Sequence, residues 1–298
     1  MHQPTEDELP LLLHRPAGHH ALRNQPAAVR RRHSEVRHER KLRVFLVGSG
    51  IAYSRSPAMQ NAAFEALGLD WTYDMLDVAP GALRDEVAGL RAPDVAGANV
   101  TIPYKQAVME HLDVIAPEAL RARAVNTIVN EGGRLGGYNT DIPAIRAAVE
   151  QVGVDPEAAN AVILGAGGAA RAAAAALLGA HLTFVARNPA DADVPGRTVA
   201  WSDRSVPALT RSADLLINAT PLGRHEEMPL RPAALPRSGA VIDLVYVTGG
   251  TPLVRKARSL GLPTVDGWEV LLTQGAISFL MWTGESAPLD AMRETLQP

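Results

Sequence analysis

The chain has 298 residues, of which 47% are hydrophobic and 20% charged, and its formal net charge is −3. This is the composition of a soluble globular protein of about two domains. Its net negative charge does not indicate binding to nucleic acid or to an acidic membrane. The absence of cysteine excludes disulfides, thiol catalysis and thiolate metal sites, and no apolar run reaches the roughly 18 residues of a membrane span. We therefore expect a cytoplasmic enzyme that acts on a small molecule.

The first forty residues differ in composition from the rest. They hold six of the nine histidines and the run Arg30-Arg31-Arg32, with almost no apolar periodicity. We expect residues 1–41 to be a disordered extension without the apolar segment and cleavage site of a signal peptide. An upstream translation start and a basic arm that touches RNA are the two explanations open for it.

From Leu42 onward, strand-like and helix-like segments alternate. Strands are expected at 42–47, 71–78 and 95–101, with helices at 58–67 and 80–90 between them. This alternation predicts an α/β fold with a mostly parallel sheet and helices on both faces. Ligands of such sheets bind at the carboxyl ends of the strands.

Two serines follow the first strand. Ser56 precedes Pro57, the pattern of a capping hydroxyl with proline at the first helical position. Ser54 has no such structural explanation. Two hydroxyls at a strand-to-helix turn are candidates to bind a polyol or a carboxylate.

Lys105 is the most informative residue. Lys41, Lys105 and Lys256 are the only lysines in a chain with 29 lysines and arginines, and an ammonium can exchange a proton whereas a guanidinium cannot. Pro103 is expected to open a helix that continues over 106–112, which would place Asn99, Thr101 and Lys105 around one strand end. The alternative is that Lys105 is only a solvated residue in the first turn of that helix.

A hairpin is expected next, with strands at 124–129 and 135–140 around Glu131-Gly132-Gly133. Asn126 within the first strand is unusual, because asparagine is depleted in strands. Asp141 follows the second strand at the start of a helix over 142–152. It is either the N-cap of that helix or a functional carboxylate.

A second unit opens with an apolar strand at 161–164 that runs into Gly165-Ala166-Gly167-Gly168-Ala169 and an alanine-rich helix. Glycines in this context let the backbone approach a pyrophosphate at the helix N-terminus, so the segment predicts dinucleotide binding. The next strand, at 182–186, ends at Arg187-Asn188. Arginine there favours the 2′-phosphate of NADP, whereas NAD would call for Asp or Glu.

The remaining elements are a strand and turn over 215–221, a strand at 240–246 and helices at 252–260 and 268–282. Thr220 lies at a strand end, where a cofactor would pass. Gln274 within the last helix is either a partnered core residue or a ligand contact. His111, His181 and His225 lack the spacing of metal ligands, so no metal site is expected.

Eight motifs, in this order, resemble the shikimate dehydrogenase family with its quinate/shikimate relatives, and they cover residues 42 to about 285. They are Ser54-Arg55-Ser56-Pro57, Asn99-Val100-Thr101-Ile102-Pro103-Tyr104-Lys105, Val125-Asn126-Thr127, Asn139-Thr140-Asp141, Gly165-Ala166-Gly167-Gly168-Ala169, Asn218-Ala219-Thr220-Pro221-Leu222-Gly223, Asp243-Leu244-Val245-Tyr246 and Gln274-Gly275-Ala276-Ile277-Ser278-Phe279.

The resemblance implies two α/β domains with a cleft between them: a substrate domain over 42–141, completed by helices within 270–298, and an NADP-binding Rossmann domain over 142–269. It also implies NADPH-dependent reduction of 3-dehydroshikimate to shikimate, with Lys105 as general acid/base beside Asp141. The implied substrate contacts are Ser54, Ser56, Asn99, Thr101, Asn126, Tyr246 and Gln274. The implied cofactor contacts are Gly165, Ala166, Gly167, Gly168, Ala169, Arg187, Asn188, Thr220 and Gly267.

Several positions depart from the family's usual residues, among them Tyr53, Gln60 and Arg224. They leave the substrate preference and the cofactor affinity more open than the reaction type. One alternative is therefore a quinate-preferring or broad-specificity polyol dehydrogenase. A non-catalytic NADP-binding sensor is a second, and the chain is expected to be a monomer or a homodimer.

Overall fold

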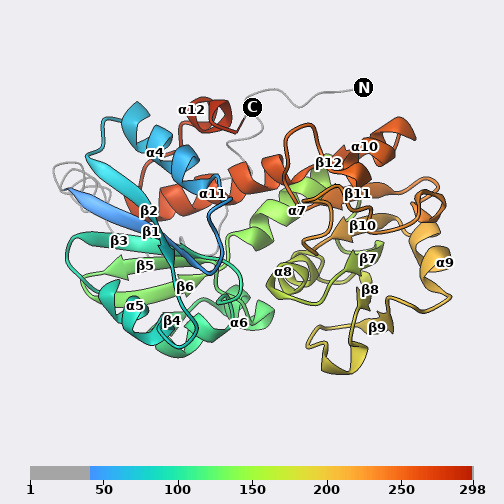
Figure 1. Cartoon of the computed structure of the whole chain (residues 1–298), viewed down its shortest axis with the longest axis horizontal. Helices are drawn as coiled ribbons and strands as arrows, with labels where there is room; N and C mark the ends of the chain where they lie inside the picture. The colour runs from blue at the N-terminus through green and yellow to red at the C-terminus, as the bar shows by residue number, and fades with distance from the viewer. Residues whose placement is uncertain (1–40, 297–298) are drawn as a thin grey trace. The chain divides into compact units, whose positions relative to one another are not determined.

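The computed structural model describes residues 41–296, so the predicted extension lies, apart from Lys41, outside the described residues. These residues form two compact units (Figure 1). The first unit holds the described residues up to Leu120 together with Val125–Thr140 and Gly275–Leu296. The second holds Arg121–Ala124 and Asp141–Gln274.

The first unit is built on a six-stranded sheet in the order β2-β1-β3-β5-β6-β4. β1 pairs in parallel with β2 and β3, whereas β5 is antiparallel to both β3 and β6. The predicted hairpin is confirmed, because Gly132 and Gly133 join β5 to β6 with φ values of 64° and 92°, the left-handed conformation that glycine adopts readily. The elements are β1 (Leu42–Gly48), α4 (Ser56–Ala66), β2 (Trp71–Asp77), α5 (Leu83–Gly89), β3 (Val95–Val100), the 3₁₀ helix η1 (Ala107–His111), β4 (Val114–Ile115), α6 (Pro117–Ala122), whose residues from Arg121 onward belong to the second unit, β5 (Thr127–Glu131), β6 (Arg134–Tyr138) and α12 (Leu289–Glu294).

The second unit has a fully parallel sheet in the order β12-β11-β10-β7-β8-β9. This is the doubly wound order of dinucleotide-binding folds, with its switch point between β7 and β10. The predicted α/β fold class is confirmed. The elements are α7 (Asp141–Gln151), β7 (Asn160–Leu164), α8 (Gly168–Ala176), β8 (His181–Ala186), η2 (Pro189–Asp191), β9 (Arg197–Ala200), α9 (Val206–Arg211), β10 (Leu215–Asn218), η3 (Pro232–Ala234), β11 (Ala240–Asp243), α10 (Pro252–Ser259), β12 (Thr264–Val265) and α11 (Gly267–Thr283), whose residues from Gly275 onward belong to the first unit.

Apolar side chains cover both faces of the second sheet. In β7, Ala161 and Ile163 join one buried cluster, and Val162 and Leu164 join another. A continuous apolar strand of this kind is typical of parallel sheets that are buried on both faces. The strand therefore holds the glycine loop that follows it on a rigid base.

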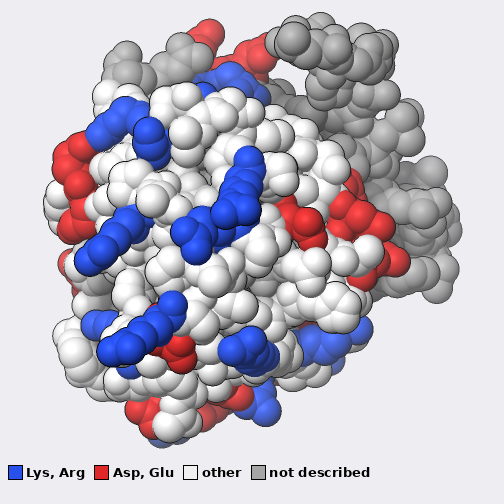
Figure 2. Space-filling model, turned by 90° about the vertical axis from the view of Figure 1, so that its right-hand side faces the viewer, with Lys and Arg blue, Asp and Glu red and all other residues white. Residues whose placement is uncertain are grey.

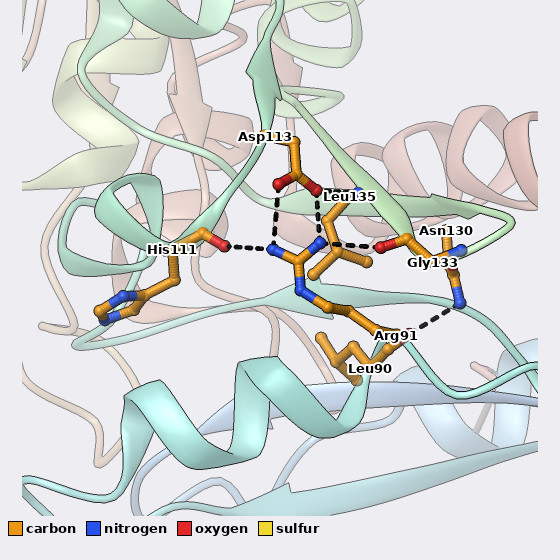
Figure 3. A network of polar contacts seen from close by, with 7 residues as sticks. All are labelled: Leu90, Arg91, His111, Asp113, Asn130, Gly133 and Leu135. Carbon is orange, nitrogen blue, oxygen red and sulfur yellow. Dashed lines mark hydrogen bonds and ion pairs between the residues drawn. The ribbon is translucent and has the colours of Figure 1, made fainter.

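An arginine-centred cluster fastens the hairpin of the first unit (Figure 3). The Arg91 guanidinium donates to the Asp113 carboxylate at 2.5 and 3.2 Å and to the carbonyl oxygens of Gly133 at 2.8 Å and His111 at 3.3 Å. Its hydrogen bonds hold the pKa of the Asp113 carboxyl below its usual value, with help from the Leu135 N–H. Because His111 ends η1, the cluster also anchors the helix that follows Lys105.

The charged side chains of the second unit are spread over its surface. Figure 2 shows the side of the second unit where α9 lies, with Lys and Arg side chains scattered over a mainly uncharged face and acidic side chains mostly toward its edges. Among residues 41–296, no helix is long and apolar enough to cross a membrane.

Candidate functional site

Lys105 lies in a turn, and the helix expected over 106–112 is shorter than predicted and of the 3₁₀ type. Only the short 3₁₀ helix η1 follows, starting at Ala107. The Lys105 carbonyl accepts a hydrogen bond from the Val125 N–H at 2.7 Å, and the Met109 N–H instead bonds to the carbonyl of Gln106 at 3.1 Å. The hydrogen bond from Val125 thus occupies the Lys105 carbonyl, the acceptor that the Met109 N–H would use in the first turn of an α-helix.

Two residues that precede Lys105 hold its turn in place. The neighbouring Tyr104 is buried, and its hydroxyl donates to the Val78 carbonyl at 2.8 Å. Thr101 continues the sheet, since its N–H donates to the Val47 carbonyl at 2.9 Å. Lys105 itself is half-buried. Its backbone is therefore fixed at the carboxyl end of β3, where the sequence predicts it.

Asn99 is the centre of a buried polar network at this strand end. Its Nδ2 lies within hydrogen-bond distance of the Asn126 carbonyl at 3.0 Å and of the Thr127 and Ser278 hydroxyls at 3.1 Å each. Its Oδ1 accepts from the Tyr73 hydroxyl at 2.8 Å. Four partners around one side chain fix the orientation of the amide.

Asn126 extends this network toward Asp141. It lies just before β5, not within it, which corrects the expected strand over 124–129. Its Oδ1 accepts from the Thr140 N–H at 2.7 Å, and its Nδ2 donates to the Thr140 hydroxyl at 3.0 Å. Thr140 directly precedes Asp141, the half-buried first residue of α7.

The sequence reading missed the residues that brace these amides. Ser278 is fully buried in α11, and its hydroxyl lies 2.9 Å from that of Thr127 and 3.1 Å from that of Thr140. One feature of the sequence could have pointed to Ser278. Ser278 stands four residues after Gln274, and positions four apart share a face of a helix.

The two serines lie together, but the capping role expected of Ser56 is wrong. Arg55 is the N-cap of α4, with no side-chain cap bond, and Ser56 is the first helical residue. The hydroxyl of Ser54 accepts from the Ser56 N–H at 3.3 Å, a serine turn that takes over the capping function. The two hydroxyl oxygens are 3.3 Å apart, with Ser54 half-buried and Ser56 buried.

The glycine loop lies at the switch point of the second sheet. Gly165 has φ of 108°, and a Cβ there would lie 3.0 Å from the Ala219 carbonyl, so only glycine fits. At Gly167, the N-cap of α8, a Cβ would meet no atom within 4 Å. The backbone before this helix therefore faces open space, a surface that fits a dinucleotide phosphate. Ala166, Gly168 and Ala169 complete the loop and are half-buried.

The other predicted cofactor residues also follow strand ends of the second sheet. Arg187 and Asn188 come directly after β8 and are exposed. Thr220 follows β10, and its hydroxyl donates to the Asn218 Oδ1 at 2.7 Å. Gly267 opens α11, which confirms the helix expected near this position.

A buried carboxylate organises the end of β11. Asp243 has no exposed surface and accepts from Asn218 Nδ2 at 2.8 Å, the Val245 N–H at 3.0 Å and the Thr251 hydroxyl at 2.6 Å. Its burial raises its pKa to about 6. The Val245 bond turns the chain, so β11 ends at Asp243 and the strand expected as far as Tyr246 is too long.

Two predicted substrate residues belong to the second unit near α11. Tyr246 is half-buried and packs against Trp268, with the ring centroids 4.8 Å apart. Gln274 is buried in α11, and its Nε2 donates to the Leu271 carbonyl at 2.8 Å.

Comparisons with known proteins identify the family. The substrate binding domain of shikimate dehydrogenase matches residues 46–128, and the C-terminal domain of shikimate 5′-dehydrogenase matches residues 267–297. The shikimate dehydrogenase (NADP(+)) of Symbiobacterium thermophilum is 44% identical over 267 residues, which cover 83% of this chain and 91% of that protein. The chain belongs to the shikimate dehydrogenase family. The resemblance found in the sequence is confirmed.

Further relatives agree with this membership of the shikimate dehydrogenase family. The shikimate dehydrogenase (NADP(+)) of Moorella thermoacetica is 42% identical over 85% of this chain and 92% of that protein. The crystal structure of shikimate 5-dehydrogenase from Thermus thermophilus, in complex with NADP(H) and shikimate, is 37% identical with a TM-score of 0.77. It covers 86% of this chain and 98% of that one.

Three residues that differ from those usual in the shikimate dehydrogenase family differ in their burial. Tyr53 is exposed, directly before Ser54. Gln60 is fully buried in α4, where its Nε2 donates to the Gly275 carbonyl at 3.0 Å and its Oε1 has no partner among the described residues. Arg224 is half-buried in the loop after β10. Within residues 41–296, no three His, Asp or Glu side chains gather as a metal site would require.

Proposed function

We propose that this protein catalyses the reversible, NADPH-dependent reduction of 3-dehydroshikimate to shikimate. The observation that carries the proposal is the Lys105 turn, which supplies an ammonium on a fixed backbone at a strand end. Membership of the shikimate dehydrogenase family supports the same reaction. The glycine loop and Arg187 supply a cradle and a charge that fit NADP.

Reduction of the ketone needs a hydride and a proton. NADPH, when bound, supplies the hydride. Lys105 donates the proton to the carbonyl oxygen during reduction and takes one from the hydroxyl during oxidation. Lysine suits this task because an ammonium gives up a proton, which a guanidinium does not do in proteins.

Asp141 is the second catalytic residue that we propose. Its carboxylate would orient the Lys105 ammonium and accept a hydrogen bond from a substrate hydroxyl. Support comes from the residue before it, because Asn126 bonds both the N–H and the hydroxyl of Thr140. The chain is thereby fixed just before Asp141.

Hydroxyls and amides would read the substrate ring. The adjacent hydroxyls of Ser54 and Ser56 would bind the ring carboxylate. Asn99 has three acceptors around its amide nitrogen and accepts from the Tyr73 hydroxyl at its oxygen, so the second lone pair of that oxygen is the group suited to a substrate hydroxyl. A site built to bond hydroxyls rejects analogues that lack them. We assign Thr101, Asn126, Gln274 and Tyr246 to the remaining contacts.

Arg187 is proposed to bind the 2′-phosphate of NADP. Arg187→Glu should lower kcat/KM for NADPH by about 10- to 100-fold, the range for a hydrogen bond to a charged group, and change that for NADH by much less. Arg197→Glu is a matched control, since Arg197 is also exposed but begins β9 and does not follow a strand end. Equal losses for NADPH and NADH would contradict the assignment.

The direct test is NADPH oxidation by the full chain with 3-dehydroshikimate, followed at 340 nm as an absorbance decrease. NADH and dehydroquinate are the controls. We expect turnover with NADPH and 3-dehydroshikimate and a lower kcat/KM when either component is replaced. A higher kcat/KM with dehydroquinate would favour a quinate-preferring enzyme, and NADPH binding without turnover would favour the sensor.

A further inference from the structure

Trp268 stands beside Tyr246, yet no motif in the sequence singles it out. It is the second residue of α11, after Gly267. Tyr246 lies three residues beyond the end of β11, outside any helix or strand. A loop residue of this kind needs an external support if it is to hold a defined position.

The first turn of α11 provides that support through the backbone. A Cβ at Gly267 would lie 2.6 Å from the carbonyl of Val245 and 2.8 Å from the Tyr246 nitrogen. Glycine is therefore what allows the helix start to press against the loop. The turn is itself fixed, because the Trp268 N–H bonds to Asp266 Oδ1 at 3.2 Å and Arg258 pairs with Asp266 at 2.9 Å.

The Trp268 side chain adds two contacts to the same loop. Its ring packs on the Tyr246 ring with centroids 4.8 Å apart and an angle of 42° between planes. Its indole Nε1 donates to the Val247 carbonyl at 3.1 Å, one residue further along. The indole thus holds both the ring of Tyr246 and the backbone that follows it.

From these contacts we infer that Trp268 is a positioning residue for Tyr246 in substrate recognition. The inference rests on the proposed function, in which Tyr246 contacts the substrate. We assign Trp268 itself no contact with substrate or cofactor. Since Gln274 lies six residues further along α11, one helix carries a proposed substrate ligand and the support of another.

The test compares Trp268→Phe and Trp268→Leu in the full chain. Phenylalanine keeps a ring against Tyr246 but lacks the indole N–H, and leucine lacks both. Loss of an aromatic pair should raise KM for shikimate by about 3- to 10-fold in the leucine variant, with a smaller rise in the phenylalanine variant. KM for NADP should stay within about twofold.

Tyr246→Phe separates this inference from its premise. It should raise KM for shikimate by about 10-fold if the hydroxyl binds substrate. The combined Trp268→Leu/Tyr246→Phe variant should then be no worse than Tyr246→Phe alone. Additive losses, a rise confined to KM for NADP, or no change in Trp268→Leu would each overturn the role of Trp268.

An unchanged KM in Tyr246→Phe would remove the premise and with it the inference, while leaving Lys105 and the reaction untouched. Trp201→Phe serves as the control for loss of an indole, because Trp201 directly follows β9, an edge strand of the second sheet, whereas the Tyr246 loop follows β11 near the opposite edge. If Trp268→Leu fails to fold, Trp268→Phe and its combination with Tyr246→Phe still decide the question.

Discussion

The strand ends of the two sheets present their chemistry differently. At the end of β3 the candidate ligands are amide and hydroxyl side chains that other buried side chains hold in place. At the end of β7 the glycine loop instead presents backbone, which at Gly167 faces open space. The candidate site of the first unit thus depends on the identity of its side chains, whereas the glycine loop of the second unit depends on the shape of its backbone.

The largest effect should come from Lys105, the side chain of the first unit that is proposed to move a proton. Lys105→Ala should lower kcat by about 10²- to 10⁴-fold, the usual contribution of general acid–base catalysis, with little change in NADPH affinity. Steady-state rates and NADPH fluorescence titration would measure the two quantities. Lys256→Ala, on α10, is the matched control. Turnover close to that of the parent chain would remove Lys105 from the mechanism.

Asp243 differs from the glycine loop of the second unit, because here a buried side chain, and not backbone, organises the end of a strand. Its pKa is raised from 3.8 to about 6, so between these pH values the folded state binds a proton that the unfolded state has lost. The free energy of unfolding should therefore fall as pH rises through this window, by about 3 kcal/mol for a shift of about two units.

Asp243→Asn removes this titration while keeping the shape of the side chain. The difference in unfolding free energy, variant minus parent, should increase from pH 4 to pH 7 and then level off, as measured by urea unfolding. Asp214→Asn is a control of opposite sign, because hydrogen bonds from Asn160 lower the pKa of Asp214. A difference for Asp243→Asn that does not change with pH would contradict the assignment.

The sequence could predict features that depend on local pattern but not those that depend on contacts between distant residues. Lys105 and the glycine loop could be proposed as site residues from the sequence, because a rare residue type and local spacing distinguish them. The support of Asn99 was not, since Ser278 is 179 residues away in the chain. Similarly, the helix expected after Pro103 is only the short 3₁₀ helix η1, because the Lys105 carbonyl accepts a hydrogen bond from the distant Val125 N–H. Local patterns therefore predict candidate ligands, whereas contacts between residues far apart in the chain decide how those side chains are held.

Removal of a brace in the first unit should cost stability. Ser278→Ala leaves the Asn99 amide and the Thr127 and Thr140 hydroxyls with one partner fewer. We expect a loss of about 1–3 kcal/mol in unfolding free energy, the cost of an unmet buried polar group. Urea unfolding measures it, with Ser259→Ala as the exposed counterpart. If both variants lose equally little, the network is not a brace.

A methyl group added to the glycine loop should affect the cofactor alone. At Gly167 the backbone has φ of −87° and a Cβ would meet no atom within 4 Å, so Gly167→Ala should fold with an unchanged melting temperature. If a phosphate of NADPH approaches this backbone, the methyl group should weaken NADPH binding by about 10-fold, a modest steric cost.

Gly89→Ala is the control for this last variant, because a Cβ at Gly89, at the end of α5, also meets nothing within 4 Å. Both variants should match the parent chain in thermal unfolding, and they should differ only in fluorescence titration with NADPH. Equal NADPH affinity in the two would mean that the open backbone of the second sheet is not where the cofactor phosphates bind. The distinction between recognition by side chains and by backbone would then not hold.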